Sequence, residues 1–124
     1  MSLCLAAGLL TATLGVDSFT LAWAHSIEKI RWEEDWHVEG TMLVLAEARI
    51  RGTGAGMEPP PGAILDKGVW HYRPALPAQR VLRLAHSPYT AGYELCLADH
   101  CAPLADRLPG IDPTTVVELS ACQQ

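Results

Sequence analysis

The chain has 124 residues, of which 49% are hydrophobic, and its formal net charge is −5 at pH 7. This size fits one domain, residues 1–124, with enough apolar surface for a core that needs no metal ion. The acidic balance argues against a nucleic-acid-binding protein, which usually has a basic face, and the longest weakly polar stretch, residues 3–16, is too short to span a bilayer as a helix.

Short strands are predicted along most of the chain. Pro and Gly recur throughout, and alternation of apolar and polar residues at period two is more common than the 3.6-residue period of a helix. This spacing predicts an all-β fold, an antiparallel β-sandwich or flattened barrel of about eight or nine strands with at most one or two helical turns. An α+β fold with a single helix is the alternative. We place strands near residues 3–7, 10–14, 18–25, 30–39, 42–50, 69–73, 80–85, 93–97 and 115–121, and a helical turn at 104–108.

Residues 3–14 are interpreted as two strands around Gly8. The alternative is the remnant of an export signal. However, no Lys or Arg precedes the apolar stretch, and Cys4 comes too early for a lipoprotein cleavage site. No signal peptide is therefore visible in the sequence, and the compartment stays open.

Residues 18–39 show the clearest alternation and place two ionisable side chains on an apolar face. His25 continues the apolar face of the first strand, and Glu34 lies on the apolar face of the second. A turn centred on residues 28 and 29 makes the numbers of opposed residues sum to about 57 or 59, which sets His25 diagonal to or opposite Glu34. The apolar residues that share these faces are Phe19, Leu21, Trp23, Ile30, Trp32, Trp36 and Val38.

A buried pair of His25 and Glu34 has two interpretations. A carboxylate on an apolar face costs several kcal/mol unless it is paired or protonated. The pair could line a pocket as an acid and base, a ligand clamp or a metal site, or it could satisfy loop amides and fix the hairpin. Ser26 is badly placed to be activated by His25 because adjacent strand residues point to opposite faces. By contrast, Arg31, Arg49 and Arg51 lie on outward faces and are expected to be solvated.

The segment Gly52–Gly62 combines three alternating glycines with three prolines. Backbone N–H groups at Gly54 and Gly56 could form an anion-binding nest, and the loop, with Met57, could close over a ligand or partner. The alternative is a tight loop that needs positive φ angles. The segment Gly52–Gly62 is not a dinucleotide-binding or P-loop motif, because prolines rather than a helix follow the glycines and no Gly-Lys-Ser/Thr is present.

The four cysteines allow two disulfides or four reduced thiols. Cys96 and Cys101 flank a four-residue hairpin turn, so they could be bonded if the protein is exported. Cys4 and Cys122 lie on the predicted first and last strands and could also meet. A C-x4-C spacing with one adjacent His is a weak zinc signal, and we expect no metal site and no cofactor.

Several motifs together resemble the small bacterial proteins of domain of unknown function 1850. Its members have a His-Ser-(Val/Ile) strand end, a Glu nine residues after that His, and a Gly-Ala-Gly-Met loop. The matching residues here are His25, Ser26, Glu34, Gly54, Gly56 and Met57. The resemblance implies an accessory role in solute uptake, because such proteins are often encoded beside TAXI-class TRAP transporters. It also implies an extracytoplasmic or membrane-associated location, although this chain shows no signal peptide.

We therefore expect a non-enzymatic accessory or binding domain that supports a TRAP-type uptake system. Its expected partners are transporter components or a small solute, bound through the six matching residues, with no nucleic acid and no membrane span. One alternative is a small hydrolase or lyase that uses His25 and Glu34. Another is a structural β domain without a ligand site.

Overall fold

The computed structural model describes residues 2–24, 30–51, 61–85, 92–98, 100–112 and 114–123. This part of the chain forms strands and a single 3-10 turn, and none of its helices could cross a membrane. The elements are β1 (Ser2–Ala7), β2 (Leu10–Leu14), β3 (Ser18–Ala24), β4 (Arg31–Glu39), β5 (Met42–Arg51), β6 (Ile64–Asp66), β7 (Val69–Tyr72), β8 (Val81–Leu84), β9 (Glu94–Leu97), β10 (His100–Pro103), η1 (Leu104–Arg107) and β11 (Val117–Cys122).

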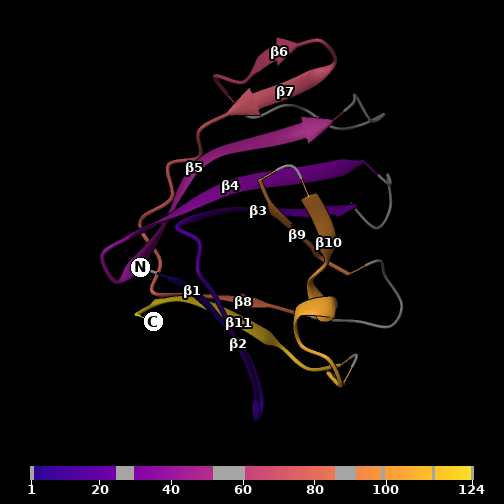
Figure 1. Cartoon of the computed structure of the whole chain (residues 1–124). Helices are drawn as coiled ribbons and strands as arrows, with labels where there is room; N and C mark the ends of the chain where they lie inside the picture. The colour runs from indigo at the N-terminus through magenta and orange to yellow at the C-terminus, as the bar shows by residue number, and fades with distance from the viewer. Residues whose placement is uncertain are drawn as a thin grey trace.

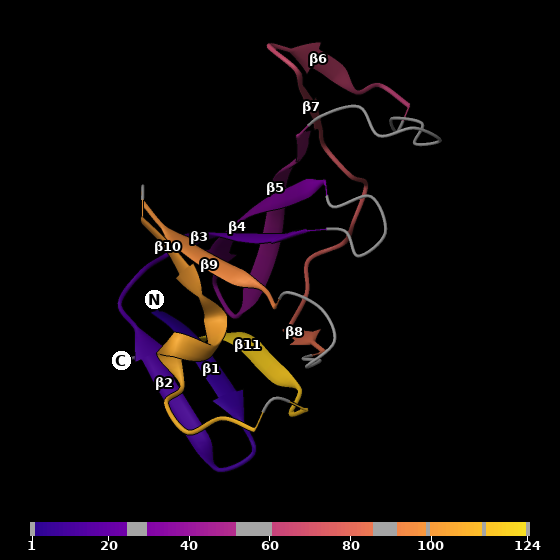
Figure 2. The same cartoon turned by 90° about the vertical axis from the view of Figure 1, so that its right-hand side faces the viewer.

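The strands form two antiparallel sheets that pack as a sandwich (Figure 1). One sheet has four strands in the order β2-β1-β11-β8, and the other has seven in the order β10-β9-β3-β4-β5-β7-β6. The predicted all-β antiparallel sandwich is therefore confirmed, and the sheets do not close into a barrel. The β6–β7 hairpin extends the larger sheet away from the smaller one (Figures 1 and 2).

All nine predicted strands are present, and the described residues contain two more. β6 spans three residues and β10 four, and neither has a long enough apolar alternation to be recognised in the sequence. The expected helical turn is η1, which follows β10 and lies between it and the four-stranded sheet (Figure 2). An α+β fold is excluded for this part of the chain.

The hydrophobic core lies between the sheets, where the inward residues of each alternating strand meet. β1 and β11 supply leucines that are fully buried, and η1 adds Leu104, which is also buried. Burial of apolar area is the main term that holds such a sandwich together, at about 25 cal/mol per Å². The most buried core residues include Leu3, Leu5, Phe19, Leu21, Trp36, Leu43, Leu95, Leu104, Leu108, Val117 and Leu119.

A β-bulge at Ala46 keeps the apolar residues of β5 on the inner face. Asp35 of β4 is opposite Glu47, whereas the next residue, Trp36, is opposite Leu45, so Ala46 is the extra residue. Inward positions on β5 are consequently odd-numbered before Ala46 and even-numbered after it. The bulge is what brings the charged residues after Ala46 to the outer face.

The β3–β4 register differs from the one expected. Leu21 lies opposite Glu34 and Trp23 opposite Trp32, so opposed numbers sum to 55 rather than 57 or 59. The two indole rings stack with centroids 6.2 Å apart, which favours this direct opposition. The predicted parity is correct, since Glu34 shares the inner face, but His25 lies outside the described residues.

Two disulfides are present, in the pairings considered from the sequence. Cys4–Cys122 joins β1 to β11 beside the chain ends, which lie close together (Figure 1). Cys96–Cys101 joins directly opposed residues of the β9–β10 hairpin. No cysteine is left as a free thiol.

Candidate functional site

Glu34 lies in the middle of the inner face of the seven-stranded sheet. Its register row runs from Leu21 on β3 through Glu34 on β4 and Ala48 on β5 to Tyr72 on β7. Leu21 and Ala48 are buried, whereas Glu34 and Tyr72 are partly buried. A carboxylate is thus held among apolar neighbours by the pairing of four strands.

The carboxylate of Glu34 contacts an indole. Trp36, two residues along the same face, donates from Nε1 to Oε1 of Glu34 at 3.2 Å. Burial raises the pKa of Glu34 above its ordinary value of 4.5, and the hydrogen bond from Trp36 only partly opposes this. Burial also raises the pKa of Tyr72 and of Tyr93, and the nearby charge of Glu34 adds to both shifts.

Aromatic rings surround this carboxylate. Trp23 stacks on Trp32 with an angle of 21° between the ring planes, and its centroid is 5.6 Å from that of Tyr93. Trp36 is buried, and the other rings are partly buried. We call this group the Glu34 site, which consists of Glu34, Trp23, Trp32, Trp36, Tyr72 and Tyr93.

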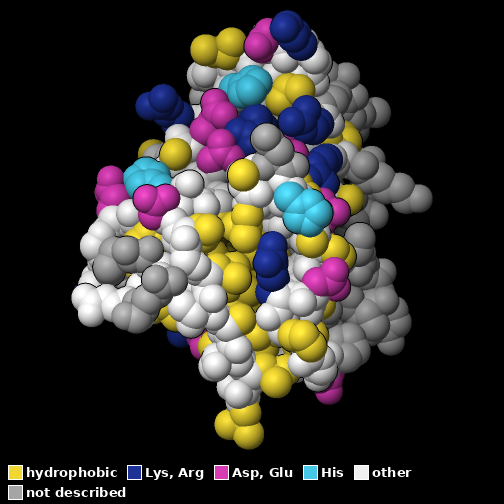
Figure 3. Space-filling view, in the orientation of Figure 1, with side chains coloured by type: hydrophobic (Ala, Val, Ile, Leu, Met, Phe, Trp, Pro, Cys, Tyr) yellow, Lys and Arg dark blue, Asp and Glu magenta, His cyan; other side chains and the backbone are white. Residues whose placement is uncertain are grey.

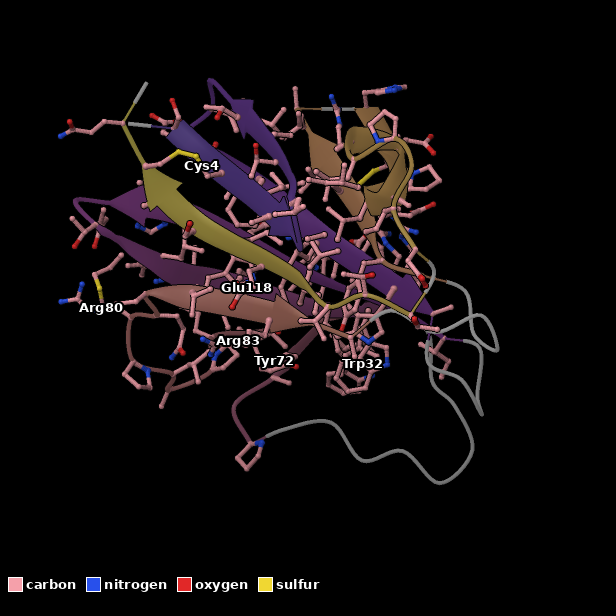
Figure 4. All side chains as sticks on the ribbon, turned by 90° about the horizontal axis from the view of Figure 1, so that it is seen from below. Cys4, Trp32, Tyr72, Arg80, Arg83 and Glu118 are labelled. Atoms are coloured by element: carbon pink, nitrogen blue, oxygen red, sulfur yellow. A yellow bond between two sulfur atoms is a disulfide. The ribbon has the colours of Figure 1, made fainter. Side chains whose placement is uncertain are left out.

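The Glu34 site lies at an open side of the sandwich. Trp32 and Tyr72 lie beside β8, on the side away from β11 (Figure 4). β8 is the edge strand of the four-stranded sheet, so within the described chain that sheet does not continue over these two rings. Glu34, Trp32 and Tyr72 are each only partly buried, so part of each side chain is accessible to solvent.

The other residues matched by the family resemblance lie outside the described ranges: His25, Ser26, Gly54, Gly56 and Met57. The described residues next to these segments show from which end of the sheet the segments start. Ala24, at the end of β3, is opposite Arg31, and Arg31 is opposite Arg51 at the end of β5. Both stretches thus leave from one end of the sheet, which is also the end that has Trp23 and Trp32.

In the part of the chain that is described, Glu34 has no cationic partner. The ion pairs of Arg and His in this part of the chain use other carboxylates, and the pKa of Glu34 is set there by burial and by the hydrogen bond from Trp36. These residues also contain no group of His, Cys, Asp and Glu that could hold a metal ion. The site, as far as it is described, is a single carboxylate in an aromatic setting.

The outer face of the same sheet has an ion-pair network that the sequence analysis missed. Of the three arginines expected to be solvated, Arg49 is only 15% exposed and binds Glu33, which is 9% exposed, whereas Arg51 is exposed as expected. Acidic and basic side chains gather over β4, β5 and β7 in Figure 3. The outer-face network consists of Arg31, Glu33, Asp35, Glu47, Arg49, Arg51, His71 and Glu94.

Arg49 is the centre of the outer-face network. Its guanidinium binds Asp35 through two hydrogen bonds of 2.6 and 2.8 Å and also donates to Glu33 and Glu47. The hydrogen bonds from Arg49 lower the pKa of Asp35. Burial acts to raise this pKa, and a hydrogen bond from Thr20 lowers it further. For Glu33, burial acts to raise the pKa, but hydrogen bonds from Arg31 and Arg49 outweigh it and the pKa is lowered.

Arg31 connects the network to the hairpin disulfide. It donates to Glu33 at 2.8 Å and to Glu94 at 2.6 Å, and its Nη2 is 3.9 Å from each sulfur of Cys96 and Cys101. Every recorded group here has a partner of opposite charge. The network therefore stabilises the sheet and leaves little free charge for catalysis.

One sequence signal pointed to this network. Residues 31, 33 and 35 share one face of their strand, as do residues 47, 49 and 51, and the two sets contain opposite charges. Only the strand register shows that they are neighbours, because Glu33 is opposite Arg49. Without that register, outward charge cannot be distinguished from solvated charge.

Two hollows adjoin the outer-face network. One, of about 320 Å³, is lined among others by Thr20, Asp35 and Cys96. The other, of about 470 Å³, is lined by residues that include Glu47 and His71. The carboxylates in both are already held by Arg49 or face His71, so neither hollow presents an unpaired reactive group.

The comparisons with known proteins identify a family without describing an activity. No curated protein and no solved structure matches the chain. A family model described as Domain of unknown function (DUF1850) matches residues 19–104, which run from β3 through β10 and include Glu34. Because this match spans more than half of the chain, the protein belongs to the DUF1850 family.

Proposed function

We propose that this protein is a non-enzymatic binding domain that supports a TRAP-type solute uptake system, with the Glu34 site as its binding surface. The observation that supports this best is the raised pKa of a carboxylate placed among five aromatic side chains at an open side of the sandwich. A buried charge of this kind is costly to the fold, so it is more readily explained by binding than by stability.

The disulfides support a place for this activity outside the cytoplasm. Both pairs of cysteines are bonded, and such bonds persist in oxidising compartments such as the periplasm. An extracytoplasmic domain is where an accessory to a solute uptake system would act. The link to TRAP transporters rests on the family resemblance of the sequence motifs.

A small hydrolase or lyase is the second candidate. The observation that favours it is the same raised pKa, because burial shifts the carboxyl of Glu34 toward the protonated form that a general acid uses. With all four cysteines bonded, no thiol nucleophile is available. Within the described residues, the recorded hydrogen bond of Glu34 comes from an indole rather than from an activated hydroxyl, which favours binding.

Co-purification tests the proposal directly. The tagged full chain is produced together with the TRAP permease and solute-binding protein of the same organism, and the detergent extract is analysed for those two components. We expect a stoichiometric complex with one of them that weakens in Glu34→Lys. The matched control is Glu39→Lys, since Glu39 is exposed and lies on the same strand.

The comparison of both variants with the native protein shows whether the association and the Glu34 site are correct. Both variants are first compared with the native protein by circular dichroism and thermal unfolding. If neither transporter component co-elutes with the native chain, the proposed association is wrong. If both lysine variants bind as the native chain does, the Glu34 site is not the binding surface.

A further inference from the structure

We infer that the Glu34 site binds the organic ammonium group of a small solute, such as a quaternary or methylated amine. This inference rests on the proposed binding function and adds the chemical class of the ligand. It comes from the charge, the ring arrangement and the position of the site.

Charge complementarity is the first part of the argument. On β4, the outward carboxylates Glu33 and Asp35 are each held by arginine, whereas the inward carboxylate of Glu34 has no cation among the described residues. A partly desolvated carboxylate is stabilised most by a cation close to it. A ligand with a positive charge supplies the countercharge that the described residues do not give to Glu34.

The aromatic rings select an organic cation over a metal ion. Trp23 and Trp32 stack beside Tyr93, Tyr93 is close enough to feel the charge of Glu34, and Trp32 lies two residues from Glu34 on the same face of β4. Aromatic faces attract a quaternary or alkylated ammonium through their quadrupole and contact its methyl groups. A metal ion would need several oxygen, nitrogen or sulfur ligands, and the described residues contain no such group.

The orientation of the carboxylate is the third part. The indole of Trp36 binds Oε1 of Glu34, which fixes the carboxyl group along the strand. The second oxygen, Oε2, has no recorded hydrogen bond from the described residues. Glu34 is only partly buried, and Trp32 and Tyr72 lie beside the edge strand β8 (Figure 4), so we place the approach of a small solute on this side.

The test compares choline with its uncharged isostere, 3,3-dimethylbutan-1-ol, on the full chain. The protein has four tryptophans, three of which are in the site, so intrinsic fluorescence reports binding. We expect saturable binding of choline that is at least about tenfold tighter than that of the isostere, because only choline has the charge. Glu34→Gln should weaken choline binding by a similar factor, and the matched variant Glu39→Gln should not.

The pH dependence is a second readout. Choline affinity should fall as the pH drops through the raised pKa of Glu34, because protonation removes the countercharge. The phenols that face the carboxylate, Tyr72 and Tyr93, have pKa values raised above 10.0 and stay neutral throughout this range. In Glu34→Gln the same pH change should have no effect on affinity.

Several outcomes would overturn the inference. These are equal binding of choline and the isostere, native affinity in Glu34→Gln, or no saturable signal up to about 50 mM choline, where a cation–π site should be occupied. If choline fails but the transporter complex forms, the ligand class is wrong and the proposed function stands. If choline binds and no transporter component co-elutes, the ligand class stands and the proposed association with the transporter is wrong.

Discussion

Arg49 and Asp35 face each other across β4 and β5 and share two hydrogen bonds, of 2.6 and 2.8 Å, on the outer face of the seven-stranded sheet. A bidentate pair of this kind fixes the relative position of two strands. It lies on the opposite face from Glu34, although Glu34 and Asp35 are adjacent in the chain. The same stretch of β4 therefore contains a carboxylate held by cations and a carboxylate that has no cation among the described residues.

Replacing Arg49 with methionine should destabilise the fold by about 1–3 kcal/mol, because half-buried Asp35 would lose its cation and buried Glu33 would keep only Arg31 and Arg51. Urea unfolding of the native and variant proteins measures this. The control is Arg83→Met, whose pair with Glu118 is exposed on the four-stranded sheet (Figure 4) and should contribute less than about 1 kcal/mol. Equal losses in the two variants would show that the outer-face network adds no more than surface charge does.

Glu34→Gln should stabilise the protein near pH 7 and lose that advantage near pH 4. The native-state pKa of Glu34 is raised above 4.5 by burial, so its contribution to stability is present below that value and is lost as pH rises through the raised pKa. Glutamine is neutral at every pH and can still accept from Trp36. Urea unfolding at about pH 4 and about pH 7 tests the sign.

Glu33 and Asp35 should give the opposite pH dependence, which serves as an internal control. Their pKa values lie below the ordinary 4.5 and 3.8, so the stability they contribute is present above those values and is lost as pH falls further. Both the native protein and Glu34→Gln should lose stability in this acid range. If Glu34→Gln is less stable than the native protein at both pH values, the carboxylate is needed by the fold.

Much of the fold could be predicted because period-two alternation reports burial directly. Phe19, Leu21 and Trp23 identified the inner face of β3, and the same parity placed Glu34 inward on β4. The register could not be predicted, since it depends on the length of the turn and on the stacking of Trp23 with Trp32. A shift of the strand register by two or four residues keeps every side chain on its face, so the apolar and polar alternation is the same in each register.

The candidate site was only partly visible in the sequence. Glu34 was identified because a carboxylate interrupts an apolar face, which is a local signal. Tyr72 and Tyr93 were not linked to it, because they come from β7 and the start of β9 and reach Glu34 only through strand pairing. Contacts made across strands that are distant in the chain have no local pattern.

The disulfide Cys4–Cys122 should stabilise the protein more than Cys96–Cys101. It closes a sequence separation of 118 residues rather than 5, so it restricts the unfolded chain more. Replacing Cys4 and Cys122 with alanine should cost about 4–5 kcal/mol, and replacing Cys96 and Cys101 about 2 kcal/mol. Counting thiols in protein denatured without reductant is the control, and four reactive thiols would rule out both bonds.

The closeness of His25 and Glu34 was predicted from opposed numbers that sum to 57 or 59, and the observed sum of 55 removes that basis, so their mutual dependence stays a prediction. A double-mutant cycle with His25→Ala and Glu34→Ala measures their coupling, which should approach about 3–5 kcal/mol for a buried charge pair. Strict additivity would mean that the side chains do not touch. Strong coupling with unchanged choline binding would make the pair structural.

Deleting Ala46 should abolish the fold, whereas Ala46→Ser should be nearly neutral. Ala46 is the exposed extra residue of the bulge, so its side chain contributes little. Its presence sets the parity of β5: without it, either Ala48 and Ile50 or Leu43 would have to leave the inner face. The same slip would turn Arg49 toward the core and away from Asp35, at the cost of an unpaired buried charge. Circular dichroism and urea unfolding should therefore show loss of cooperative folding in the deletion variant alone. A deletion variant with native stability would mean that β5 reaches the same pairing without a bulge.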